Sequence, residues 1–84
     1  MTLQSLRKRI DQIDLKILTL LNRRAAVSAR VGQIKKKQGQ PVFDGRRERQ
    51  ILRRLILANG GPLPSGAVEK IFREVLRASR RGQV

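Results

Sequence analysis

The chain has no cysteine, histidine, tryptophan or tyrosine among its 84 residues. Without these residues it cannot form disulfides, thiolate or imidazole metal sites, Ser-His-Asp triads or cysteine nucleophiles. Any chemistry must therefore come from arginine, lysine, aspartate, glutamate, serine, glutamine and the backbone. We expect neither a metal ion nor a cofactor.

Long apolar runs and acidic residues are also scarce. No run approaches the roughly 18 apolar residues of a membrane span, and the N-terminus lacks the apolar core of a signal peptide. We therefore expect a soluble, cytoplasmic protein that does not enter a membrane. Six acidic residues stand against 20 lysines and arginines, a net charge of +14. This excess indicates an anionic partner, such as a small molecule, a nucleic acid or a lipid headgroup.

Aliphatic residues, by contrast, recur at helical spacing in the first part of the chain. A strict alternation of three and four residues predicts one long helix over residues 3–37 with a stripe that faces a partner helix. The ten stripe positions, here called the seam, are Leu3, Leu6, Ile10, Ile13, Ile17, Leu20, Arg24, Val27, Val31 and Ile34. The charge of Arg24 requires a counterpart in this stripe, which Asp14, Glu48 or an anionic ligand would provide.

The rest of the chain predicts two shorter helices. Residues 38–41 end the long helix with a glycine followed by a proline, and Asp44 is a candidate N-cap for a helix that reaches about Asn59. A third helix begins at residues 64–65. Because no strand alternation appears, we expect an all-α fold, with one long and two shorter helices in a single domain over residues 1–84.

The predicted long helix is too long for the rest of one chain to cover. About 35 residues extend roughly 50 Å, more than the width of a compact chain of this size. We therefore expect an intertwined homodimer in which two long helices pack antiparallel about a twofold axis near residues 18–19. Two equivalent sites would then each combine Arg24 and Lys35 of one chain with Arg7 of the other. The alternative for Arg7 is a solvated surface arginine.

Two further groups of polar residues could contribute to a site. Asp44, Arg47 and Glu48 open the second helix, where Arg47 can clamp a carboxylate and Glu48 can accept from a hydroxyl. Ser79 and Gln83 continue the apolar stripe of the third helix, four residues apart and thus on one face. The alternatives are a capped helix start and a frayed chain end. The glycine before Gln83 favours fraying.

Six motifs in order along the chain resemble the all-helical chorismate mutase family. They are Leu6–Asp14, Leu20–Arg24, Val31–Lys35, Pro41–Asp44, Arg47–Arg49, and Ile71–Glu74 leading to Ser79. The resemblance implies a homodimer of three-helix chains whose two active sites each use both chains. It also implies the conversion of chorismate to prephenate in phenylalanine and tyrosine biosynthesis, without a cofactor.

The resemblance implies roles for residues from both chains. Arg24 and Arg7 of the partner chain would hold the substrate carboxylates, while Lys35 and Gln83 would donate to the ether oxygen. Glu48 and the backbone at Asp44 would hold the ring hydroxyl. Ser79 would assist at the ring carboxylate, and Arg47 matches a family position that supports the site.

One small substrate does not explain the strongly basic surface. Its arginines include Arg46, Arg53, Arg54, Arg77, Arg80 and Arg81. Because members of the family also occur fused to other aromatic-pathway enzymes, the resemblance suggests that this surface serves a neighbouring domain or an acidic protein partner.

Three other functions remain open at this point. An isochorismate pyruvate lyase on the same fold would use a similar cluster of cations, although the set of Asp44, Arg47 and Glu48 favours the mutase because it provides for a ring hydroxyl. A basic helical nucleic-acid-binding protein would fit the net charge, but the chain lacks tyrosine and tryptophan for base stacking, and Arg24 lies in the seam. The third is a regulatory or vestigial mutase domain with little activity.

Overall fold

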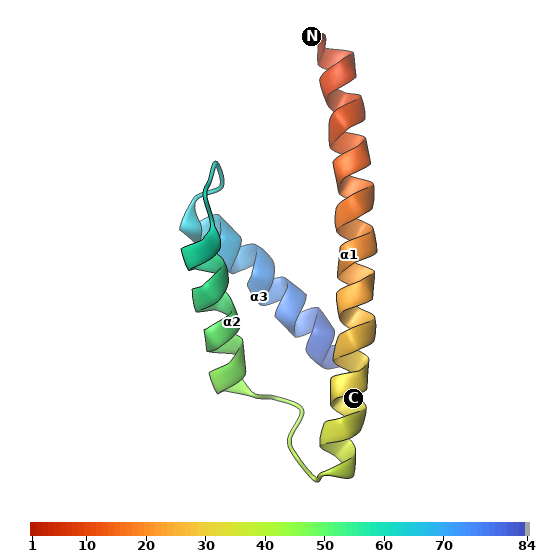
Figure 1. Cartoon of the computed structure of the whole chain (residues 1–84), viewed down its shortest axis with the longest axis vertical. Helices are drawn as coiled ribbons and strands as arrows, with labels where there is room; N and C mark the ends of the chain where they lie inside the picture. Colours follow the sequence, from red (N-terminus) through yellow and green to blue (C-terminus); the bar gives the residue numbers. More distant parts are fainter. Residues whose placement is uncertain (84) are drawn as a thin grey trace.

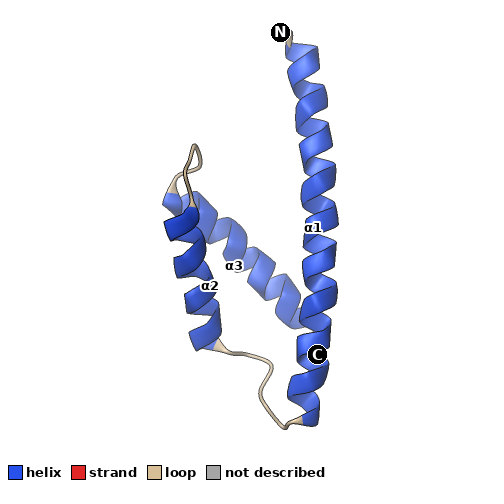
Figure 2. Ribbon diagram, viewed as in Figure 1, coloured by secondary structure: helices blue, strands red, loops and turns tan. Residues whose placement is uncertain are grey.

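The computed structural model describes residues 1–83 and consists of three helices joined by two loops (Figures 1 and 2). The helices are α1 (Leu3–Lys37), α2 (Gly45–Ala58) and α3 (Ser65–Arg81). No strand occurs in this part of the chain. The predicted all-α class and the positions of all three helices are therefore confirmed. None of the helices within residues 1–83 has the length and apolar character that crossing a bilayer requires.

The helix ends follow from local hydrogen bonding. Thr2 caps α1, and its hydroxyl accepts from the backbone N–H of Ser5 while the Ser5 hydroxyl accepts from the N–H of Thr2, both at 3.0 Å. Serine thus completes a capping box that usually needs glutamate or glutamine. Gly39, with φ of 68°, follows the end of α1. Asp44 caps α2 as predicted, because its carboxylate accepts from the N–H of Arg47 at 3.1 Å.

The chain is elongated because α1 is long and the other two helices lie along only part of it. The principal extents are 55 × 23 × 15 Å. Figure 1 shows α2 and α3 beside the C-terminal half of α1, while the N-terminal half extends alone. In the described chain α3 packs against both other helices, and α1 and α2 do not pack directly on each other. The position of α3 therefore determines how α2 is placed relative to α1.

The apolar core of a single chain is small. Leu52, Val68 and Leu76 are its buried members, with exposed fractions of 5–7%, and they come from α2 and α3. Ile71 of α3 is half exposed. The nine aliphatic residues of the seam are between 39% and 65% exposed. Most of the apolar face of α1 therefore has no cover from its own chain.

Gly32 of α1 lies against Gln83, which follows the end of α3. It is the one buried residue of α1, and a Cβ built there would lie 2.7 Å from Cβ and 2.9 Å from Cα of Gln83. Glycine within a helix costs about 1 kcal/mol relative to alanine. The close approach accounts for this unfavourable residue, because any side chain here would displace Gln83.

We expect Gly32→Ala to displace Gln83 without unfolding the chain. The gain in helix propensity, about 1 kcal/mol, offsets part of the lost packing, so the free energy of unfolding should change by no more than about 1–2 kcal/mol. The measurement is the NMR cross-peak between the side-chain amide of Gln83 and Ser28. It should be present in the wild type and in Gly66→Ala, whose added Cβ meets open space. Its persistence in Gly32→Ala would contradict this account.

Candidate active site

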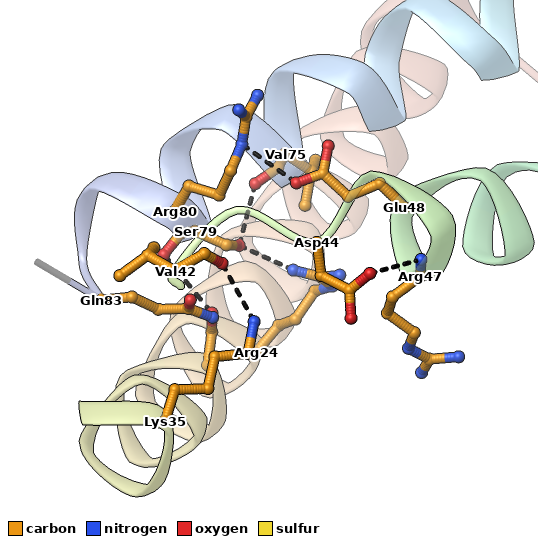
Figure 3. Close-up of polar contacts among 11 residues, drawn as sticks. Arg24, Lys35, Val42, Asp44, Arg47, Glu48, Val75, Ser79, Arg80 and Gln83 are labelled. Carbon is orange, nitrogen blue, oxygen red and sulfur yellow. Dashed lines mark hydrogen bonds and ion pairs between the residues drawn. The ribbon is translucent and has the colours of Figure 1, made fainter. Parts of the chain in front are cut away.

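The candidate site is a cavity of about 280 Å³ between the C-terminal half of α1, the start of α2 and the end of α3. Figure 3 shows side chains from all three helices and from the α1–α2 loop gathered there. Seven of the eight residues that the sequence singled out line it: Arg24, Lys35, Asp44, Arg47, Glu48, Ser79 and Gln83. The fold therefore collects, in one place, residues that lie up to 59 positions apart (83 − 24).

Arg24 joins α1 to α3 inside this cavity. Its Nη1 donates a hydrogen bond of 2.6 Å to Oγ of Ser79, and that hydroxyl donates in turn to the carbonyl of Val75 at 2.8 Å. Within residues 1–83 Arg24 forms no ion pair, so neither Asp14 nor Glu48 is its counterpart. A guanidinium has five N–H donors, and the others remain available to an anion.

Lys35 reaches from the last turn of α1 toward the loop that leads to α2. Its Nζ donates to the carbonyl of Val42 at 2.9 Å, and the side chain is half-buried. Lys36 and Lys37 are exposed, so the favourable effect of cations near the C-terminal end of the helix dipole is sufficient to explain them. Lys35 alone among the three lines the cavity, and an ammonium group carries two further N–H donors that can serve a ligand.

Gln83 is held by α1 although α3 has already ended. The helix ends at Arg81, as the following glycine predicts, but Nε2 of Gln83 donates to Oγ of Ser28 at 2.8 Å. Its Oε1 is buried without a hydrogen-bond partner in the described chain. The sequence interpretation missed Ser28. The available signal was its spacing, because it follows Arg24 by four residues and so shares the helix face that leads to Gly32.

The start of α2 contributes the acidic part of the site. Glu48 is partly buried, and its Oε2 lies 3.0 Å from Nε of Arg80. The guanidinium carbon of Arg80 lies 4.8 Å from the centre of the Phe43 ring. The assignment of Arg80 to the basic surface was therefore wrong, because its side chain is only 35% exposed and lines the cavity. The side chains of Asp44 and Arg47 are exposed at the rim.

Arg7 is the predicted site residue that the single chain does not bring to the cavity. It is exposed near the start of α1, and 28 residues separate it from Lys35. This separation corresponds to about 42 Å along the helix axis. Its participation therefore requires a second chain and stays a prediction.

The charge of the cavity suits a small dianion. The cations in its lining are Arg24, Lys35, Arg47 and Arg80, and the carboxylates are Asp44 and Glu48. Because Glu48 is paired with Arg80 and Asp44 caps α2, the remaining cations create a net positive field. Residues 1–83 contain no group of three or more acidic side chains placed to hold a metal ion.

The sequence matches known proteins over almost its whole length. A model of the family described as chorismate mutase type II matches residues 6–84. A bifunctional chorismate mutase/prephenate dehydratase of Aquifex aeolicus is 42% identical over 80 residues, which cover 90% of this chain and 22% of that protein. The chain thus spans about a fifth of the length of this curated relative.

Solved structures agree with this match. A chorismate mutase of Thermus thermophilus superposes with a TM-score of 0.89 at 36% identity, covering 90% of this chain and 86% of the other. A chorismate mutase of Helicobacter pylori in complex with prephenate gives 0.88 at 31% identity, covering 96% and 88%. Together with the family model, these similarities establish that the chain belongs to the chorismate mutase type II family.

Proposed function

We propose that the chain converts chorismate into prephenate in the biosynthesis of phenylalanine and tyrosine. The observation that carries this proposal is one cavity lined by the N–H donors of Arg24, Lys35 and Gln83 and by the acceptor Glu48. Membership of the family supports it, as does the complex of the Helicobacter pylori relative with prephenate. A positively charged site without histidine or cysteine limits the chemistry to reactions that charge and shape can accelerate.

The conversion of chorismate to prephenate is such a reaction. It is a Claisen rearrangement within one molecule, in which a carbon–oxygen bond breaks as a carbon–carbon bond forms. The protein has to hold a dianion in a compact, chair-like conformation, which removes much of the entropic barrier. It also has to place N–H donors at the ether oxygen, where negative charge builds in the transition state. Each such donor is worth about 3–4 kcal/mol.

The arginines and Lys35 take the roles that their free donors allow. Arg24 uses Nη1 for Ser79, and its remaining N–H groups hold one carboxylate of the substrate. Lys35, fixed by its contact with the Val42 carbonyl, donates to the ether oxygen. Arg7 of the partner chain holds the second carboxylate. Positive charge on all three residues also attracts the dianion to the site.

The ring hydroxyl and ring carboxylate are held by residues of α2 and α3. Glu48 accepts from the hydroxyl, and the backbone at Asp44 provides a second contact. Ser79 is buried between Arg24 and the backbone of α3, so it assists at the ring carboxylate chiefly by fixing the guanidinium. Arg47, exposed at the rim, supports the site without being enclosed by it.

The buried Oε1 of Gln83 suggests how this residue becomes a donor. Within residues 1–83, Nε2 donates to the Ser28 hydroxyl and Oε1 has no partner. Rotation of the amide by about 180° about its last torsion would let Ser28 donate to Oε1, because a hydroxyl can act as donor or acceptor. Ser28 would give up its long hydrogen bond of 3.4 Å to the carbonyl of Ser79 for this. Nε2 would then take the buried position of Oε1, and the ether oxygen of the substrate would be the acceptor that its N–H groups need there.

We propose further that two chains form an antiparallel homodimer through the seam. Its nine aliphatic side chains remain between 39% and 65% exposed in one chain. Monomeric proteins rarely leave so continuous an apolar stripe in water. Antiparallel packing about residues 18–19 would cover it and would bring Arg7 of each chain to the cavity of the other.

The arginine-rich outer face of α2 is where we propose an acidic protein partner or a fused domain binds. An open hollow there is lined by Arg46, Arg49, Arg53, Arg54, Gln50, Leu57 and Ala58. None of these arginines forms an ion pair within residues 1–83. Fusion in the Aquifex aeolicus relative, of which the match covers 22%, is consistent with a further domain. We also propose a cytoplasmic location, because the proposed reaction is a step in the biosynthesis of amino acids.

The direct test is turnover of chorismate by the purified chain. We expect prephenate from chorismate, whereas a lyase would give salicylate and pyruvate from isochorismate. Arg24→Ala and Lys35→Ala should each lower kcat/KM at least about a hundredfold, because each removes a positioned donor. The control variants Arg23→Ala and Lys36→Ala remove the same charge from exposed neighbours outside the cavity and should stay within about twofold. Turnover no faster than the spontaneous reaction in the wild type would refute the function, and full activity in both site variants would refute the site.

The dimer is tested by sedimentation equilibrium. We expect the wild type to sediment as a dimer, and Ile17→Lys to sediment as a monomer that has lost turnover. Ile17 lies next to the proposed twofold axis, so the substitution buries two like charges close together. Leu57→Lys is the control, because Leu57 lies on α2 outside the seam and is 80% exposed. If the wild type is a monomer at protein concentrations where it is fully active, the shared site is contradicted.

A further inference from the structure

We propose that Arg80 is a positioning residue that holds the Glu48 carboxylate for the substrate hydroxyl. The inference rests on the proposed function, because it assigns to Arg80 a part in the same site. Nε of Arg80 lies 3.0 Å from Oε2 of Glu48, and this pair is the one ion pair of residues 1–83 that joins α3 to α2. The other two ion pairs join neighbours within α3 and are more exposed.

Arg80 and Glu48 lie between the substrate cavity and a second hollow. Both residues line that cavity and also the second hollow, of about 270 Å³, between α2 and α3. Phe43 lines only the second hollow, and the guanidinium of Arg80 lies over its ring at 4.8 Å. Figure 3 shows the guanidinium turned away from Arg24 and Lys35. The ion pair therefore occupies Oε2 and leaves Oε1 of Glu48 for a hydroxyl donor.

The contact between Arg80 and Glu48 depends on charge rather than on a hydrogen bond. Nε of Arg80 is fully buried and lies 3.0 Å from Oε2, but no hydrogen bond joins the two atoms. The contact is therefore a charge pair between partly buried groups, with exposed side-chain fractions of 35% and 20%. The Phe43 ring limits the movement of the guanidinium through a cation–π contact. Charge and the ring together therefore hold the guanidinium beside Glu48.

The charge of Arg80 also makes Glu48 compatible with a dianion. An unpaired carboxylate in the cavity would repel the substrate at short range, where little water screens the interaction. Pairing with Arg80 cancels this repulsion while the acceptor remains. The ring hydroxyl takes no part in the bonds that change. Its hydrogen bond to Glu48 therefore stabilises the bound substrate and the transition state equally. Loss of Arg80 should therefore raise KM more than it lowers kcat.

The test is a double-mutant cycle with Glu48→Gln, measured with chorismate on the full chain. We expect Arg80→Met to lower kcat/KM about tenfold, mainly through KM, because coupled neighbours interact by amounts of this size. Arg80→Lys keeps the charge and should recover most of the loss. In the Glu48→Gln background Arg80→Met should change kcat/KM by less than about twofold. Arg81→Met, the exposed neighbour without an ion pair in the described chain, is the matched control and should behave as the wild type.

The outcomes separate this inference from its alternatives. Wild-type activity in Arg80→Met overturns the inference. A loss of kcat/KM that is equally large in the Glu48→Gln background also overturns it, because such a loss would indicate direct contact of Arg80 with the substrate. A lower melting temperature with an unchanged KM would indicate a purely structural role and also overturns it. If Arg80→Met does not fold, Arg80→Gln provides the same comparison. Absence of turnover in the wild type would refute the proposed function instead, so the two failures are distinguishable.

Discussion

The hydrogen bond from Arg24 to Ser79 is the contact on which the arrangement of the site depends. It joins α1 to α3 at 2.6 Å, inside a helix stripe that is otherwise aliphatic. Because α3 is the only helix of the described chain that packs on both others, fixing it on α1 also places α2. The close approach at Gly32 and the contact between Gln83 and Ser28 continue the same interface toward the end of the chain. The cavity is the space that remains between these contacts.

The site performs its proposed chemistry with charge and position alone. Its donors differ in how they are fixed: Arg24 by a buried hydroxyl, Lys35 by a backbone carbonyl, and Gln83 by a serine on the opposite helix. Each contact leaves further donors for a ligand, so the same interactions that stabilise the fold would also orient the groups that we propose for catalysis. These contacts are sufficient for the proposed reaction because it needs no proton transfer and no nucleophile. The family membership of the chain is consistent with this division of roles.

Regular periodicity made the fold predictable, and close tertiary contacts limited the prediction of the site. The three-four spacing and the turn residues predicted all three helices, since helix formation follows from local patterns. Arg24 and Lys35 were found because a charge in or beside an apolar stripe is conspicuous. Ser28 and Gly32 were missed because small residues on a helix give no signal until the approaching segment is known. Arg80 was misassigned because its partners, Glu48 in α2 and Phe43 in the loop before it, lie outside α3 and cannot be inferred from the spacing within that helix.

The central claim is that each active site is shared between two chains, and complementation tests it most directly. Chains with Arg7→Ala and chains with Lys35→Ala should each be inactive alone. When the two are unfolded together and refolded, half of the dimers are mixed, and each mixed dimer contains one site with both residues intact. The account predicts recovery of about a quarter of the wild-type turnover in this mixture. A mixture that remains as inactive as its separate components would contradict the shared site.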